Sequence, residues 1–159
     1  MKIMNKFQKK LANRKKDNKG FSLVELIIVI AIMAILVGIV GTQVIPYINK
    51  SKVAKDQQVL NSISTAAVAA YSENGATSTM DIDVFGTAAT DPTAAKIQAD
   101  IKTASGYENL DQFKKALGSE AGKNVTTVKV HFDATAHKAT TSVEPADGKY
   151  PIKDVEATL

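Results

Sequence analysis

Apolar side chains form a long, almost uninterrupted run near the start of the chain. Residues 21–41 read FSLVELIIVIAIMAILVGIVG, in which only Ser22 and Glu25 are polar. A helix over this segment rises about 31 Å, which is close to the thickness of the hydrocarbon core of a bilayer. The run therefore predicts a helix that is able to span a membrane.

From Tyr47 onward the pattern becomes amphipathic, and it predicts that the same helix continues. Apolar residues recur at mostly helical spacing, as expected for a face that packs on a core: Ile48, Val53, Val59, Leu60, Ile63, Ala67, Ala70 and Tyr71. Polar residues fill much of the rest: Lys50, Lys52, Lys55, Asp56, Gln57 and Asn61. Asn74 and Gly75 form a stop signal. A helix over residues 21–73 would be about 80 Å long, so its first half needs lipid or sibling subunits as partners.

The remainder of the chain predicts a small mixed head, which makes the fold class α+β. Residues 74–80 are expected to form a loop. Helices are expected over residues 94–103, started by Asp91 and Pro92 with Ile97 and Ile101 inward, and over residues 109–117, stopped by Gly118. Strands are expected over residues 124–133, 138–144 and 151–158, the first two joined by a hairpin loop at 133–137. We expect this antiparallel sheet to lie across residues 53–71 of the long helix.

Charge is concentrated at the N-terminus. Residues 1–20 hold eight of the 20 basic side chains and only one of the 16 acidic ones, so the rest of the chain is net acidic. A basic flank before an apolar run sets membrane orientation, and Phe7 is the only aromatic residue in the flank, which argues against nucleic-acid stacking. The segment fits three interpretations: an ordinary secretory signal, a plain anchor, or a signal cut before the apolar run.

Glu25 discriminates among these interpretations. A carboxylate near the centre of a membrane helix costs about 2.5–3.5 kcal/mol, and a plain anchor gains nothing from it. One explanation is that Glu25 lies near the interface and is tolerated there. The other is that it has a cationic partner. A cut between Gly20 and Phe21 would create one, because the new α-amine of Phe21 in one subunit can pair with Glu25 of a parallel neighbour.

The stretch KGFSLVE at residues 19–25, followed by the apolar run, resembles the class III signal of type IV prepilins. The resemblance covers residues 14–72. It implies a pilin fold, in which a long N-terminal helix packs against a small antiparallel sheet. It also implies that prepilin peptidase cuts after Gly20 and methylates Phe21, and that Glu25 is the assembly glutamate. The implied partners are further copies of the chain, the membrane before assembly, an assembly ATPase and a platform protein.

Two features depart from the common family pattern. The leader is longer than in many members, and the proline often found at the position of Thr42 is here Pro46. Proline lacks an N–H and crowds the carbonyl four residues earlier, while Gly38 and Gly41 add backbone freedom. We therefore expect the helix to bend over residues 38–46. Ala31 and Ala34 share a face with the two glycines, where helices can approach closely.

Other chemistry is weakly supported. The chain has no cysteine, no glycine-rich phosphate loop and no hydrolase motif, so we expect no enzyme and no cofactor. His131 and His137 flank the predicted hairpin loop near Asp133, but two solvated strand residues are the favoured interpretation over a metal site. Asp81, Asp83 and Asp91 suggest calcium, but their spacing is not that of an EF-hand and a solvated loop is favoured.

The sequence thus predicts a structural subunit that forms filaments. We expect a cleaved leader (1–20), a transmembrane and assembly helix (21–46), its amphipathic half (47–74) and a head (75–159). The precursor would sit in the plasma membrane, and the filament on the bacterial surface would serve adhesion, motility or biofilm formation. The alternatives are a pseudopilin of a type II secretion or DNA-uptake system, and an uncleaved membrane-anchored binding domain. No specific nucleic acid is expected.

Overall fold

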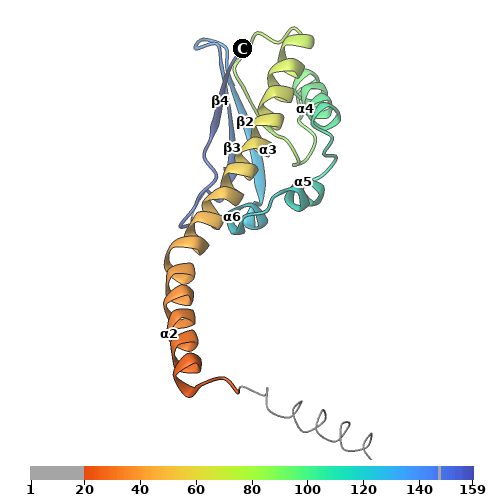
Figure 1. The fold of residues 1–159 in the computed structure, drawn as a ribbon. Helices are drawn as coiled ribbons and strands as arrows, with labels where there is room; N and C mark the ends of the chain where they lie inside the picture. Colours follow the sequence, from red (N-terminus) through yellow and green to blue (C-terminus); the bar gives the residue numbers. More distant parts are fainter. Residues whose placement is uncertain (1–19, 147) are drawn as a thin grey trace, which may run out of the picture. The chain divides into compact units, whose positions relative to one another are not determined.

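The computed structural model describes residues 20–146 and 148–159 (Figure 1). Except for Gly20, the predicted leader lies outside the described residues. The chain divides into two compact units between Val44 and Ile45. We call residues 45–159 the globular unit.

The long N-terminal helix is confirmed. It consists of α2 (Leu23–Ile39), η2 (Val40–Val44) and α3 (Ile45–Glu73), and the helical backbone runs from Leu23 to Glu73. The first part is long and apolar enough to cross a membrane, judged by length and composition. The predicted C-terminal end of the helix is also confirmed. Helix α3 ends at Glu73, and Gly75 adopts a left-handed φ of 60°.

The segment η2 is a π-helical turn, which is wider than an α-helical one. It ends immediately before Ile45 and Pro46, and Pro46 is the residue that would crowd the carbonyl of Thr42 in a regular α-helix. The Thr42 hydroxyl donates a hydrogen bond to the carbonyl of Gly38 at 3.0 Å. The altered turn therefore falls inside the region where a bend is predicted, and the bend itself stays a prediction.

A four-stranded antiparallel sheet completes the α+β fold. Its strands, in spatial order, are β1 (Met80–Asp83), β2 (Thr127–Asp133), β3 (Lys138–Glu144) and β4 (Val155–Thr158). Helix α3 lies across its inner face and contacts β3 and β4, which confirms the predicted packing. The other helices are α4 (Pro92–Ser105), α5 (Leu110–Ala116) and α6 (Glu120–Asn124).

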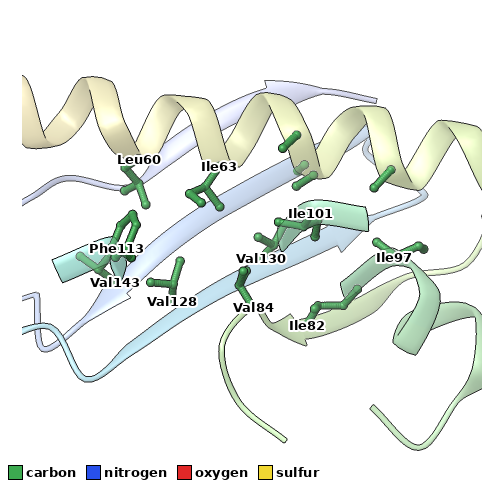
Figure 2. Packing of buried hydrophobic residues seen from close by; sticks show 14 of the residues in the cluster. Leu60, Ile63, Ile82, Val84, Ile97, Ile101, Phe113, Val128, Val130 and Val143 are labelled. Carbon is green, nitrogen blue, oxygen red and sulfur yellow. The ribbon is translucent and has the colours of Figure 1, made fainter. Parts of the chain in front are cut away.

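The core lies between α3, the sheet and α4. Leu60 and Ile63 from α3 meet Val128 and Val130 from β2, and Ile97 and Ile101 approach from α4 (Figure 2). The inner face alternates strictly with a polar outer face along β2 and β3, as expected for a sheet with one solvated side. Tyr71 stacks on Phe132 with ring centroids 4.6 Å apart, which ties the end of α3 to the sheet.

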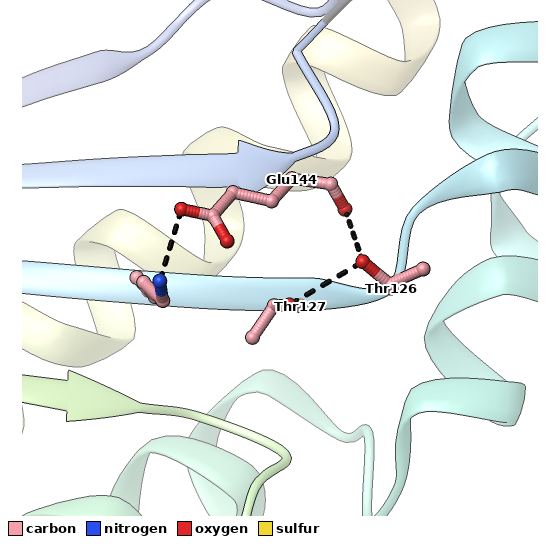
Figure 3. Close-up of polar contacts among 4 residues, drawn as sticks. Thr126, Thr127 and Glu144 are labelled. Atoms are coloured by element: carbon pink, nitrogen blue, oxygen red, sulfur yellow. Dashed lines mark hydrogen bonds and ion pairs between the residues drawn. The ribbon is translucent and has the colours of Figure 1, made fainter.

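The outer face of the sheet is held by polar pairs. Lys129 lies 2.9 Å from Glu144, and this carboxylate raises the pKa of the Lys129 ammonium through its hydrogen bond and its charge. The hydroxyl of Thr126 donates to the Glu144 carbonyl at 3.0 Å (Figure 3), and the backbone N–H of Thr126 donates to the same carbonyl at 2.6 Å. At the other end of β2, the hydroxyl of Thr135 lowers the pKa of the Asp133 carboxyl.

Several local expectations were wrong. Strand β1 and helix α6 were not predicted, and Asp81 and Asp83 lie in β1 rather than in a loop. The strand expected from residue 124 starts at Thr127, because α6 occupies the residues before it.

Asp56 was placed among the polar residues of the amphipathic helix, yet its exposed fraction is 1%. The helix turns this carboxylate inward, where Gly118 and Ser119 bind it.

The C-terminal segment is held without a disulfide. The amide group of Gln57 on α3 donates to the carbonyl of Lys153 at 2.7 Å and accepts from its N–H at 3.0 Å. Ile152 beside this clamp is buried, and the N–H of Leu159 donates to the carbonyl of His137 at 3.0 Å. Packing and backbone hydrogen bonds therefore secure this end, as the absence of cysteine requires.

Thr141 offers a test of the core. Its hydroxyl is buried and has no hydrogen-bond partner among the described residues. We expect Thr141→Val, which keeps the shape, to raise the free energy of unfolding by about 1 kcal/mol, since an unpaired buried polar group is removed. Thermal unfolding of the mature protein in detergent measures the change. The matched control is Thr140→Val on the outer face, which should have little effect; a loss of stability specific to Thr141→Val would contradict the assignment.

Candidate functional site

The start of α2 is built by two polar side chains that cap each other. Ser22 has extended backbone angles, and its hydroxyl accepts from the N–H of Val24 at 3.3 Å. The carboxylate of Glu25 accepts from the N–H of Ser22 at 2.8 Å. This reciprocal arrangement is a capping box, in which backbone donors that have no partner within the helix are satisfied by side chains. It fixes Leu23 as the first helical residue.

The capping box leaves the predicted cleavage position outside the helix. Gly20 and Phe21 have no regular secondary structure, and the side chain of Phe21 is 89% exposed. A protease needs access to an irregular backbone, so the peptide bond between these residues is presented in a suitable form. Glu25 lies one helical turn further on, with one oxygen already used in capping.

Helix α2 has an apolar surface on every side. None of its residues is buried, and its isoleucine, leucine, valine and methionine side chains lie exposed. A Cβ atom added at Gly38 or Gly41 would meet no atom within 4 Å. The described residues therefore give neither glycine a packing reason within this chain. A helix that is apolar all round is found in a membrane or inside an assembly.

Comparison with known families identifies this segment. The family model of the prokaryotic N-terminal methylation motif matches residues 15–41. The chain carries a class III prepilin signal. This motif is the hallmark of type IV pilins and pseudopilins, and over residues 15–41 the chain is similar to these proteins. No curated protein and no solved structure matches it.

The matched residues of the methylation motif include most of the predicted site. Gly20, Phe21, Glu25, Gly38 and Gly41 fall inside the range, whereas Pro46 lies beyond it. The match does not assign a role to any single residue. Cleavage after Gly20, methylation of Phe21 and assembly through Glu25 therefore stay predictions.

The structure does not assemble the metal sites considered from the sequence. His131 pairs with Thr140 across the sheet rather than with His137, which lies in the turn with a φ of 51°. The Nδ1 atom of His131 instead lies 2.7 Å from a carboxylate oxygen of Asp81. Within residues 20–146 and 148–159, no group of three or more histidines and carboxylates is placed to hold a metal ion.

Asp91, the third carboxylate considered for a calcium site, has a different role in the structure. Asp83 accepts from the N–H of Gly86 at 3.0 Å, and Asp91 caps α4 by accepting from the N–H of Ala94 at 2.8 Å. Its oxygen is therefore used by the helix N-terminus, as is common for an aspartate in this position.

Sequence reasoning missed the role of Ser22. The signal was present, because a serine followed three residues later by a glutamate, just before an apolar run, is the pattern of a capping box. Glu25 was interpreted only through its charge. The structure adds that the same carboxylate caps the start of α2, so that Gly20 and Phe21 lie outside the helix.

Proposed function

We propose that this protein is the structural subunit of a type IV pilus, cut between Gly20 and Phe21 and polymerised through its N-terminal helix. The observation that carries the proposal is the combination of a fully exposed apolar helix, α2, with an otherwise packed globular unit. Such a large apolar surface requires a nonaqueous partner. A bilayer provides one for the precursor, and a bundle of sibling helices provides one for the filament.

Glu25 supplies the register in this scheme. In a bundle of parallel helices, its carboxylate pairs with the Phe21 α-amine of a neighbour, so that both charges are neutralised in an apolar environment. A staggered position that leaves either charge unpaired is strongly disfavoured. The open space around Gly38 and Gly41 supports close approach of neighbouring helices. Before cleavage no such amine exists, which keeps precursors from polymerising.

The partners follow from the same scheme. Prepilin peptidase acts on the Gly20–Phe21 bond and methylates the new N-terminus, while an assembly ATPase and a platform protein move subunits out of the membrane. The filament then serves adhesion, motility or biofilm formation at the bacterial surface. A pseudopilin of a type II secretion or DNA-uptake system shares the methylation motif, and filament length separates the two.

The first test is the intact mass and N-terminal sequence of the protein from its native cells. We expect a chain that starts at Phe21 and is heavier than the unmodified sequence by one methyl group. Antibodies to the globular unit should label micrometre-long surface filaments if the protein is a pilin, and only short periplasmic or wall-spanning structures if it is a pseudopilin. A chain that still carries residues 1–20 would overturn the filament proposal and favour an anchored binding domain.

A further inference from the structure

The charges of the globular unit are separated along α3. We call the end where α3 begins the proximal end and the end where α3 finishes the distal end. Eight of the twelve lysines of this unit belong to the proximal end: Lys50, Lys52, Lys55, Lys114, Lys115, Lys123, Lys149 and Lys153. Among the described residues, four carboxylates accompany them: Asp56, Asp111, Glu120 and Asp154. The ion pair of Lys129 and Glu144 also lies at this end, next to α6, and adds no net charge. The proximal end therefore carries a clear positive excess.

Contacts place these lysines together. Lys50, Lys52 and Lys55 lie exposed on the first turns of α3, and the backbone of Lys153 is clamped to Gln57 just beyond them. Lys149 lines a cavity together with Asn49 of α3.

The remaining proximal lysines come from the α5 and α6 region. Lys114, Lys115 and Lys123 line a single depression beside Leu117, next to the loop that binds Asp56. Helix α6 contacts α3 and α5 contacts α6, and in Figure 1 the C-terminus lies at the other end of the globular unit. Because Asp56 is buried and hydrogen-bonded, it does little to offset the positive surface.

The rest of the globular unit has the opposite sign. Apart from the Lys129–Glu144 pair, its described residues hold three lysines and eight carboxylates. Five of these carboxylates belong to the distal end: Glu73, Asp81, Asp100, Asp133 and Glu156. Asp100 accepts from the side chain of Asn74 at 2.8 Å, directly after α3, and Asp133 follows Phe132, which stacks on Tyr71. Lys138 forms an ion pair with Glu156 at 2.6 Å and lies opposite Asp133 in the sheet, so it offsets part of this negative charge.

Resting on the proposed pilus function, we propose that the proximal end of one globular unit docks on the distal end of the next copy. Opposite charges on opposite ends of one unit favour a head-to-tail contact between parallel copies. Such a contact uses two different surfaces, so it continues from copy to copy and builds an open helical filament rather than a closed pair. The charges orient incoming subunits and disfavour like ends meeting. The axial position of each subunit relative to its neighbour is then set by the contact between globular units as well as by Glu25.

A charge-reversal pair tests this contact in the full chain, expressed in its native cells. The first variant carries Lys52→Glu and Lys55→Glu at the proximal end. The control carries Lys96→Glu and Lys102→Glu on α4, which changes the net charge equally. We expect the proximal variant to yield about ten-fold fewer sheared surface filaments, because like charges then face one another. The control should not fall below the wild type, because Lys96 and Lys102 flank Asp100 and their reversal only adds negative charge near the distal end. Both variants should accumulate as processed subunits that start at Phe21.

A swap of charges makes the test specific. Three proximal reversals, K50E, K52E and K55E, are combined with three distal ones, E73K, D81K and E156K. Each triple alone should lower filament yield, and the combined chain should recover most of it, because the ends are again of opposite sign. No recovery, or an unchanged yield with the proximal reversals alone, overturns the contact.

Two other outcomes are distinguishable. If the proximal reversals lower membrane retention and processing while the yield of filaments per processed subunit is unchanged, the lysines face an anionic lipid surface, and the contact between copies is wrong. If processed wild-type subunits form no filaments at all, the proposed pilus function fails, and the docking contact fails with it.

Discussion

Replacing Glu25 with glutamine is expected to abolish surface filaments while the N-terminus is still processed. Glutamine at this position can still accept the hydrogen bond that the N–H of Ser22 now donates at 2.8 Å, since glutamate and glutamine both complete a capping box. The start of α2 should therefore be unchanged. What is lost is the negative charge that we assign to the Phe21 α-amine of the neighbouring subunit.

The expected loss is large because the amine would be left alone in an apolar bundle. Removing one partner of a buried ion pair costs about 3–5 kcal/mol, and each factor of ten in affinity corresponds to about 1.4 kcal/mol. Each subunit added to the filament would pay this cost, so filament yield should fall by about a hundred-fold or more. Sheared filaments and intact mass of the membrane pool measure assembly and processing separately.

Ser22→Ala is the matched control for Glu25→Gln. It removes the other half of the capping box, where the Ser22 hydroxyl accepts from Val24, but leaves the carboxylate in place. We expect filaments to persist, with a modest loss of about 1 kcal/mol in helix stability. If Ser22→Ala abolishes filaments while Glu25→Gln does not, then Glu25 acts through the helix start, and its charge has no role in assembly.

The long N-terminal helix, α4, α5 and the central hairpin could be predicted because their signals are local. A long apolar run sets α2, and the spacing of Leu60, Ile63 and Ala67 sets the buried face of α3. The predicted strand over residues 138–144 coincides with β3, since its alternation is regular and the turn before it is short. Helix α4 begins where Asp91 and Pro92 indicate that it should.

Elements that depend on distant partners were missed. Strand β1 has only four residues, two of which are aspartates, and this residue type is depleted in strands. It is a strand because Ile82 pairs with Val130 and fills the core, a contact between residues far apart in the chain. Gln98 is similar: its buried amide donates to the carbonyls of Asp83 and Thr87 at 2.6 and 3.2 Å, and no local pattern indicates that.

The error at Asp56 has a different origin. Positions 53, 56, 60, 63 and 67 follow the alternating three- and four-residue spacing of one helix face, so Asp56 falls on the face that packs on the core. The prediction followed residue type and assigned it to the polar side. Position on the helix was the better guide, and an acidic residue at a core position signals a buried hydrogen-bond network.

Asp56→Asn is expected to destabilise the globular unit by about 3 kcal/mol. The carboxylate accepts from the N–H of Gly118 at 2.7 Å, from the N–H of Ser119 at 3.0 Å and from the Ser119 hydroxyl. An asparagine keeps one acceptor oxygen but turns an amide N–H₂ toward a group that also donates. Buried donors that lose their acceptor cost about 1–3 kcal/mol each.

The backbone next to Asp56 is closely packed. Gly122 lies so close that an added Cβ would meet an oxygen of Asp56 and the Cβ of Leu117, each at 2.6 Å. The Ser119 hydroxyl, which binds Asp56, also accepts from the N–H of Gly122 at 2.9 Å and so caps α6. One carboxylate therefore connects α3 to the whole segment that carries α6. Its loss should loosen that segment before the sheet unfolds.

Urea unfolding of the mature protein in detergent, followed by near-ultraviolet circular dichroism of the buried aromatic rings, measures the loss at Asp56. Lys55→Ala is the control, because Lys55 is the adjacent exposed residue and its removal should change the unfolding free energy little. Ser119→Ala should fall between the two, since it removes one of three donors and uncaps α6. If Asp56→Asn is as stable as the wild type, then the carboxylate is not the tie between α3 and α6, and packing of Leu117 and Phe113 alone must hold this end of the unit together.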